Sequence, residues 1–181
     1  MMVNQAKIPT FENKQLGFQA IGMPYKGGDV IMYVILPKLK TSLKELMCRL
    51  KPEDIGTVIS KSQPAEVFYV IPKMKLEHES NLRDTLLELN VKSMFDPQSA
   101  NFTNLAEVDG VYVSDILHKV NVELNEKGTI AAAATVVSMN RGGYVNFRAD
   151  RPFLFFIYNI KVGIITFWGS VKKPVPFKTI N

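Results

Sequence analysis

Alternating runs of apolar and polar residues predict a chain rich in strands. Two apolar runs, Phe18–Pro24 and residues 30–36, flank a polar turn that contains two adjacent glycines. Glycine adopts positive φ without strain, as tight turns require, so these runs are interpreted as a buried hairpin. A second buried hairpin is expected where the aromatic run 152–158 and the run 164–169 flank a turn over residues 159–163.

Helical spacing of apolar residues follows the first hairpin. Ser42 and Glu45 have the spacing of a capping box, in which two side chains satisfy the free amides at a helix N-terminus. Pro52 suits the first turn of a second short helix, and Ser80 is expected to cap a third. Cys48 lies within the first helix and is expected to be a core residue beside its apolar stripe.

Two further strands are predicted in the middle of the chain. One runs from about residue 66 to residue 76, and Pro72 predicts a bend or an edge position there, because proline donates no ladder hydrogen bond. The clearest alternation covers residues 116–125 and indicates a half-buried strand. His118 falls on its apolar face and is expected to be a hydrogen-bonded core histidine rather than a catalytic one.

Small residues dominate the segment 128–141, between two strand-like regions. The four alanines at 131–134 favour helix, whereas the β-branched residues beside them favour strand, so a helix, a surface loop and a mobile strand all stay open. As a strand, the segment would place small or β-branched side chains on one face, which suits a narrow slot between strands. The 13 residues from Thr129 to Arg141 would then span about 43 Å.

The succession of elements predicts an α+β fold with mostly antiparallel sheets and peripheral helices, because strands and helices do not alternate as in parallel sheets. With 181 residues, 46% of them hydrophobic, the chain can build a sizeable core. The net charge of +5 is spread along the chain and gives no support for nucleic-acid binding. No apolar run approaches the roughly 18 residues of a membrane helix, so no membrane partner is expected.

Catalytic chemistry has little material in this sequence. There are two histidines, His78 and His118, one cysteine, and no phosphate-binding loop, zinc or nucleophile-elbow motif. We therefore expect no metal, no cofactor and no enzyme activity.

Several segments together have the sequence and spacing of one known family. They are residues 1, 2 and 5, and the segments 34–37, 71–73, 95–96, 116–119, 125–134, 149–157 and 169–174. With them the chain resembles the C-terminal half of a serpin, a serine protease inhibitor. The alanine-rich segment and the run Pro152-Phe153-Leu154-Phe155 are the most specific parts of the likeness.

The resemblance implies that residues 1–181 are the C-terminal portion of a single serpin domain, with residues 127–146 as its reactive-centre loop. Serpins present this loop as bait, and its cleavage lets it insert as a new strand in the large sheet, here beside residues 116–125, while it carries the acylated protease along. Lys73, paired with Glu126, and His118 would have gating roles. The implied hinge and insertion residues are Glu126, Gly128, Thr129, Ala131, Ala132, Ala133, Ala134 and Thr135.

Two reactive bonds are open. Arg141–Gly142 would suit a trypsin-like protease, because arginine can pair with an acidic specificity pocket. The usual family spacing from Glu126 instead gives Gly142–Gly143. The leading hypothesis is an inhibitor of a trypsin-like serine endopeptidase. The alternative is a non-inhibitory relative with a binding or storage role, favoured by Ile130 at a usually acidic position and by a short link from Arg141 to residue 147.

The resemblance also implies two partners and a location. One partner is the protease, and the other is an N-terminal serpin segment that would complete the sheet and carry a signal peptide. An extracellular location is expected, with a cytoplasmic one as the alternative. Asn101 opens an Asn-Phe-Thr sequon, which is a glycosylation acceptor in a secreted chain.

Overall fold

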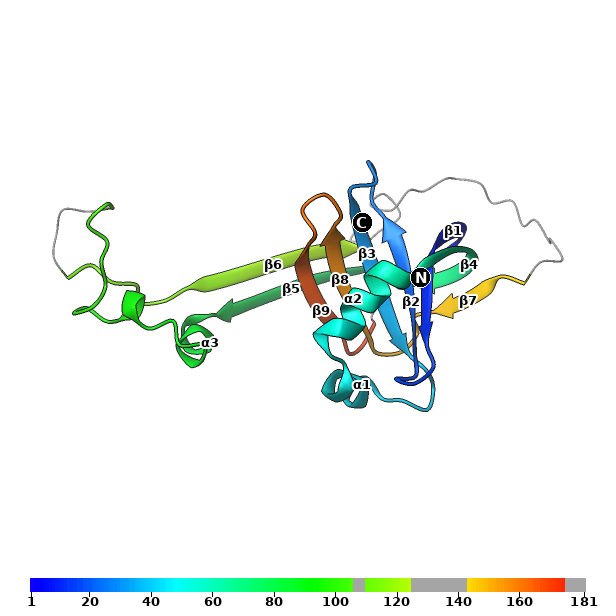
Figure 1. Cartoon of the computed structure of the whole chain (residues 1–181), viewed down its shortest axis with the longest axis horizontal. Coiled ribbons are helices and arrows are strands. Elements are labelled where there is room, and N and C mark those ends of the chain that lie inside the picture. Colours follow the sequence, from blue (N-terminus) through cyan, green and yellow to red (C-terminus); the bar gives the residue numbers. More distant parts are fainter. Residues whose placement is uncertain (106–109, 125–142, 175–181) are drawn as a thin grey trace, which may run out of the picture. The chain divides into compact units, whose positions relative to one another are not determined.

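A computed structural model describes residues 1–105, 110–124 and 143–174. The chain divides into two compact units, a large unit of Met1–Met74 and Leu124–Asn181 and a small unit of Lys75–Glu123. The described elements are strands with a few short helices (Figure 1), which confirms the predicted α+β class.

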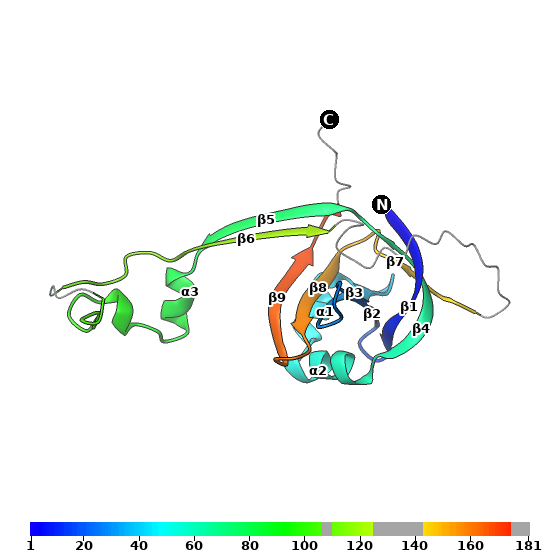
Figure 2. The same ribbon diagram turned by 90° about the horizontal axis from the view of Figure 1, so that it is seen from above.

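One mixed sheet forms the large unit. Its strands are β1 (Met2–Asn13), β2 (Phe18–Pro24), β3 (Val30–Pro37), β4 (Gln63–Ile71), β7 (Val145–Arg148), β8 (Phe153–Asn159) and β9 (Ile164–Val171). Among the described residues, they lie in the order β7-β4-β1-β2-β3-β8-β9. Neighbours are antiparallel, except that β7 runs parallel to β4. Figure 2 shows how strongly this sheet curves.

The hairpin predicted at the start of the chain is confirmed. Strands β2 and β3 pair along their length, from Phe18 opposite Pro37 to Pro24 opposite Ile31. Gly27 and Gly28 in the turn have φ of 98° and 78°, a region that other residues enter only with strain.

Two helices follow, as the spacing predicts. The first, α1 (Leu43–Arg49), begins where the Ser42 side chain accepts a hydrogen bond of 3.1 Å from the Glu45 amide. The second, α2 (Pro52–Lys61), begins with proline, and the Lys51 amide donates to the Asp54 carboxylate at 2.9 Å. Acidic residues in the first turns complement the helix dipoles.

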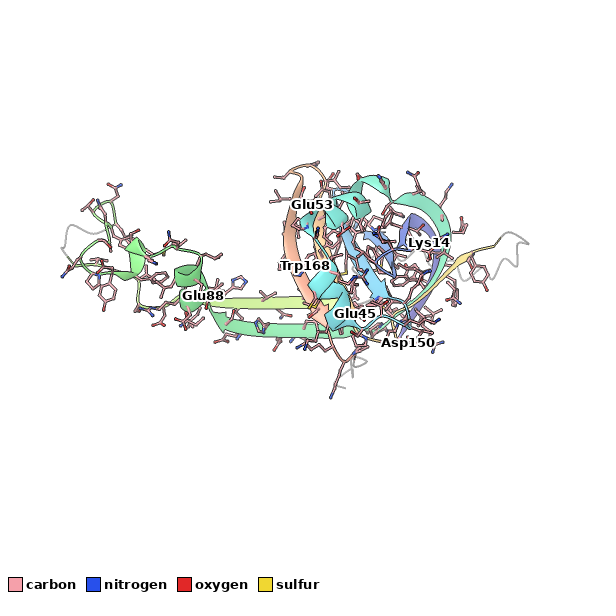
Figure 3. All side chains as sticks on the ribbon, turned by 60° about the horizontal axis from the view of Figure 1, so that its bottom comes forward. Lys14, Glu45, Glu53, Glu88, Asp150 and Trp168 are labelled. Atoms are coloured by element: carbon pink, nitrogen blue, oxygen red, sulfur yellow. The ribbon has the colours of Figure 1, made fainter. Side chains whose placement is uncertain are left out.

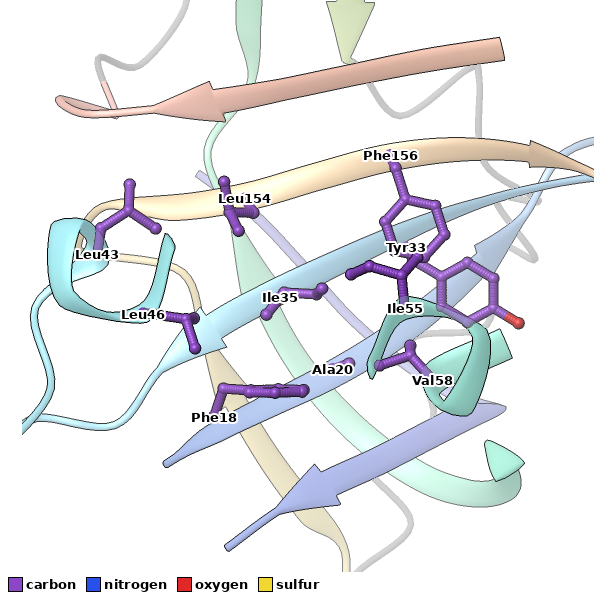
Figure 4. Packing of buried hydrophobic residues seen from close by; sticks show 10 residues of the cluster. All are labelled: Phe18, Ala20, Tyr33, Ile35, Leu43, Leu46, Ile55, Val58, Leu154 and Phe156. Carbon is purple, nitrogen blue, oxygen red and sulfur yellow. The ribbon is translucent and has the colours of Figure 1, made fainter. Parts of the chain in front are cut away.

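The main core lies between these helices and the sheet. Helix α1 contributes two leucines and α2 an isoleucine and a valine, which pack against side chains of β2, β3 and β8 (Figure 4). Tyr33 and Phe156 stack with ring centroids 5.0 Å apart. The buried cluster comprises Phe18, Ala20, Tyr33, Ile35, Leu43, Leu46, Ile55, Val58, Leu154 and Phe156.

The expectation that Cys48 lies in the core was wrong, because its side chain is exposed. Helix α1 turns its Leu43 and Leu46 side toward the sheet. Cys48 lies two residues beyond Leu46, which is about 200° around the helix and so points away from the core.

The second hairpin is also only half as predicted. Strands β8 and β9 pair as expected, and β8 is buried. Strand β9 is largely exposed, including Phe167 and Trp168, which are 41% and 49% accessible. The reason is its place at the edge of the sheet.

The bend at Pro72 is confirmed, because β4 ends at Ile71 and a separate strand begins two residues later. This strand, β5 (Met74–Asn81), pairs with β6 (Leu117–Leu124) in a two-stranded sheet of the small unit. Helix α3 (Arg83–Glu88) and the single 3-10 turn η1 (Ser93–Phe95) complete the small unit.

Two predictions for the small unit were wrong. Ser80 caps no helix but lies within β5, because the ladder continues to Leu82, whose amide bonds the Ile116 carbonyl at 2.8 Å. His118 is exposed, and in β6 only Val122 and Leu124 are buried. A two-stranded ribbon cannot bury either face by itself, so alternation alone overestimated burial here.

Core packing gives a direct stability test. Leu46→Ala should lower the free energy of unfolding by about 2–5 kcal/mol, because Leu46 is 0% accessible and its loss leaves a cavity under α1. Met47→Ala, one position along and 48% accessible, should change it by about 0.5 kcal/mol or less. Urea unfolding of both variants measures this, and equal losses would contradict the packing.

Candidate functional site

The candidate site lies where the chain enters the sheet at β7. This four-residue strand pairs with β4 on one side and forms the opposite edge of the sheet from β9. Val145 lies opposite Val67, and Arg148 lies opposite Val70. The Ala149 amide extends this ladder with a bond of 2.8 Å to the Val70 carbonyl.

The inner face holds β7 in place. Phe147 is 0% accessible, and its neighbour Tyr69 on β4 is also buried. The Asn4 side-chain amide of β1 donates to the Tyr69 hydroxyl at 3.0 Å. Burial raises the pKa of Tyr69, and the hydrogen bond from Asn4 acts in the opposite direction, so the neutral phenol is an integral part of this face.

The outer face carries an exposed aromatic pair. The rings of Phe68 on β4 and Tyr144, just before β7, lie 6.1 Å apart at an interplanar angle of 58°. Tyr144 is 57% accessible. In the ladder, Phe68 lies between Gln5 of β1 and Asn146 of β7. We call these four residues the outer-face patch.

A polar cluster fixes the turn that follows β7. The Arg151 guanidinium donates to the Pro37 carbonyl at the end of β3, at 2.9 Å, and to the Arg148 carbonyl at 3.4 Å. Asp150, labelled in Figure 3, pairs with Arg148 at 3.0 Å and with Arg151 at 3.3 Å. The planar guanidinium can bind several acceptors at once, so Arg151 ties the end of β7 to β3.

The small unit contains a charged hairpin. Lys119 of β6 and Glu79 of β5 form an ion pair at 3.3 Å, and Lys75 and Glu77 pair along β5. The hydrogen bond from Lys75 lowers the pKa of Glu77. These side chains are exposed, so they add little to stability.

Much of the predicted reactive-centre loop lies outside the described residues. This holds for Glu126, Gly128, Thr129, Ala131, Ala132, Ala133, Ala134, Thr135, Arg141 and Gly142. Gly143 is described and exposed, and residues 145–146 at the end of the predicted loop are the first two of β7. Lys73 is half-buried in the link between β4 and β5, and His118 is exposed on β6.

Asn101 lies in an exposed turn of the small unit. Its side-chain oxygen accepts bonds from the Thr103 amide at 3.3 Å and the Thr103 hydroxyl at 2.9 Å. The two polar residues of the sequon are therefore in direct contact at the surface.

Two searches of residues 1–105, 110–124 and 143–174 found nothing. These ranges hold no group of three or more acidic, histidine or cysteine side chains placed to bind a metal. Their helices are also too short or too polar to cross a membrane.

A strand-flanked segment beside a mixed sheet of this order defines a class of protein that comparison with known proteins identifies. The sequence model of the family Serpin (serine protease inhibitor) matches residues 1–174. The chain therefore belongs to the serpin family. A solved serpin from the trematode Schistosoma haematobium has the same fold, with a TM-score of 0.80 at 21% identity over 96% of this chain and 46% of that one.

Curated relatives extend the likeness to sequence. Antithrombin-III of Homo sapiens is 33% identical over 96% of this chain and 39% of its own length. Intracellular coagulation inhibitor 1 of Tachypleus tridentatus is 33% identical over 96% and 43%. Glia-derived nexin of Mus musculus is 34% identical over 88% and 41%. The chain thus spans about two fifths of the length of these relatives.

Sequence reasoning missed Phe68, Tyr144 and the contacts of Arg151. The one signal for Tyr144 was an aromatic residue directly after two glycines, which suggests an anchor at the end of a loop. The contacts join positions 76 and 114 residues apart, so only pairing of β7 with β4 and of β3 with β8 reveals them.

Arg151 should be important for the docking of β7. Arg151→Ala should lower the free energy of unfolding by about 1–2 kcal/mol, because two backbone carbonyls lose a charged donor. It should also accelerate hydrogen exchange at the Ala149 amide. Arg148→Ala, whose side chain is 63% accessible, is the matched control and should cost about 0.5 kcal/mol. Equal effects would show that Arg151 only contributes charge.

Proposed function

We propose that the chain forms the C-terminal portion of a serpin-type inhibitor of trypsin-like serine endopeptidases. The observation that carries this proposal is a family match that runs through residues 127–146 without interruption. Those residues lie between β6, which ends at Leu124, and β7, which begins at Val145. The 20 residues between the two strands are long enough to serve as bait.

In the proposed mechanism, the protease serine attacks the carbonyl of Arg141. An ester forms between the serine and Arg141, and the Gly142 amine leaves with the proton that the protease base supplies. The alternative bond, Gly142–Gly143, would follow the same steps but would present no side chain to an acidic pocket. Arginine at the bait position is what favours a trypsin-like target.

The released segment would then insert beside β6. Gly128 and Thr129 would act as the hinge beside Glu126, and the segment from Ala131 to Thr135 would enter the sheet. Among the described residues, β6 pairs with β5 on one side, which leaves its other edge for the new strand. Lys73 and His118 would have gating roles beside that slot.

An N-terminal serpin segment is the proposed second partner. Strand β9 exposes apolar side chains, among them Ile164 at 51% and Trp168 at 49% (Figure 3). With α1 and α2 it lines an apolar groove of about 880 Å³. An exposed apolar surface of this kind normally contacts another polypeptide. Residues 1–181 have a mass of 20.4 kDa, so a native mass equal to this would count against the partner.

The inhibitor is best tested with trypsin and the complete protein. The wild type should form a complex that survives detergent and heat, seen as a shifted band on a denaturing gel, because the acyl ester is covalent. Arg141→Ala should abolish the complex, and Lys173→Ala, a basic residue far along the chain, should leave it intact. Clean cleavage after Arg141 without a complex would contradict the trapping mechanism.

One observation favours the non-inhibitory alternative. Strand β7 begins at Val145, so only three residues separate it from Arg141. Such a short link holds the bait close to the sheet and hinders access by a protease. Heating the cleaved protein separates the two functions, because insertion of the loop should raise the melting temperature strongly, whereas a binding or storage protein should show no rise.

We also propose an extracellular location with a glycan on Asn101, whose exposed turn leaves room for one. A cytoplasmic location remains the alternative, and one similar protein carries the name intracellular coagulation inhibitor. Asn101→Gln should remove one glycan from the secreted protein and lower its mass accordingly by mass spectrometry. Gln98→Asn, which creates no sequon, is the control. An unchanged mass would exclude modification of Asn101.

A further inference from the structure

The exposed outer-face patch has no role in holding the sheet together. Phe147, Tyr69 and Val67 bury the opposite face, whereas Tyr144 stays 57% accessible although its ring touches Phe68. Gln5 and Asn146 on either side are exposed and offer amide donors and acceptors. An aromatic centre with neutral polar groups around it is the composition typical of a protein interface.

Chain connectivity sets how far this patch can lie from the bait. Tyr144 follows Arg141 by three residues, and three fully extended residues span at most about 11 Å. A specific protein interface covers about 800 Å² on each partner, equivalent to a disc of about 16 Å radius. A protease centred on Arg141 therefore covers Tyr144. The same holds, at a shorter distance, for the alternative bond after Gly142.

We infer that the outer-face patch of Gln5, Phe68, Tyr144 and Asn146 is a docking surface for the protease that cleaves the loop. The inference rests on the proposed function. Tyr144 and Phe68 would contribute most of the contact energy, because rigid aromatic side chains bury large areas at little entropic cost. The two amides would orient the protease on the side of the bond that follows Arg141.

The test uses trypsin and the complete protein carrying one substitution at a time. Tyr144→Ala and Phe68→Ala should each reduce the second-order rate of complex formation about tenfold. Tyr144→Phe, which keeps the ring, should stay near the wild-type rate. Tyr112→Ala is the matched control, because Tyr112 is a similarly exposed tyrosine, 48% accessible, in the small unit. It should leave the rate unchanged.

Two further readouts separate docking from support of the loop. The melting temperature and the number of inhibitor molecules consumed per protease should not change in Tyr144→Ala. The affinity for trypsin whose catalytic serine is replaced by alanine should fall about tenfold, because this complex forms without cleavage. A lower melting temperature with unchanged affinity would overturn the inference and make Tyr144 a structural anchor.

The remaining outcomes distinguish the inference from the proposed function. Normal rates in Tyr144→Ala and Phe68→Ala, with the complex still formed, would overturn the patch and leave the inhibitor intact. If the wild type is cleaved without trapping, a tenfold loss of kcat/KM for cleavage in the two variants would support the patch while trapping fails. If trypsin neither cleaves nor binds the wild type, both proposals fall.

Discussion

The parallel pairing of β7 with β4 is the constraint on which the rest of this chain depends. Parallel neighbours cannot be joined by a tight turn, so a long connection must leave β4 and return to the same end of the sheet. Here that connection contains the whole small unit and residues 125–142. The fold therefore presents a long segment whose C-terminal end is fixed to a sheet edge.

The sequence predicted those elements whose pattern agrees with their surroundings. The β2–β3 hairpin, the two capped helices and the break at Pro72 follow from turn glycines, a capping serine and a missing amide hydrogen. Prediction failed where burial depends on distant strands. The patterns of β9 and His118 are apolar enough for a core, yet one lies at an edge and the other on a two-stranded ribbon.

The candidate site was predictable in family and location but not in its contacts. Strand β1 and the short β7 escaped prediction because Pro9 interrupts one and the other has only four residues. Without these two strands, Phe68 has no neighbours and Tyr144 is merely a residue after glycines. The hinge, bait and insertion residues were assigned from resemblance and remain predictions, since they lie outside the described residues.

The anchoring of β7 decides whether the edge of the sheet survives an approaching protease. Burial of Phe147 contributes about 1.5–3 kcal/mol, and each ladder hydrogen bond adds about 1 kcal/mol. The guanidinium of Arg151 adds contacts to two carbonyls. Peeling β7 away therefore costs several kcal/mol before any new contact forms. A protease should meet β7 still paired with β4, so the three residues before the strand limit how far the bait reaches, and the outer face of the sheet becomes part of the recognition surface.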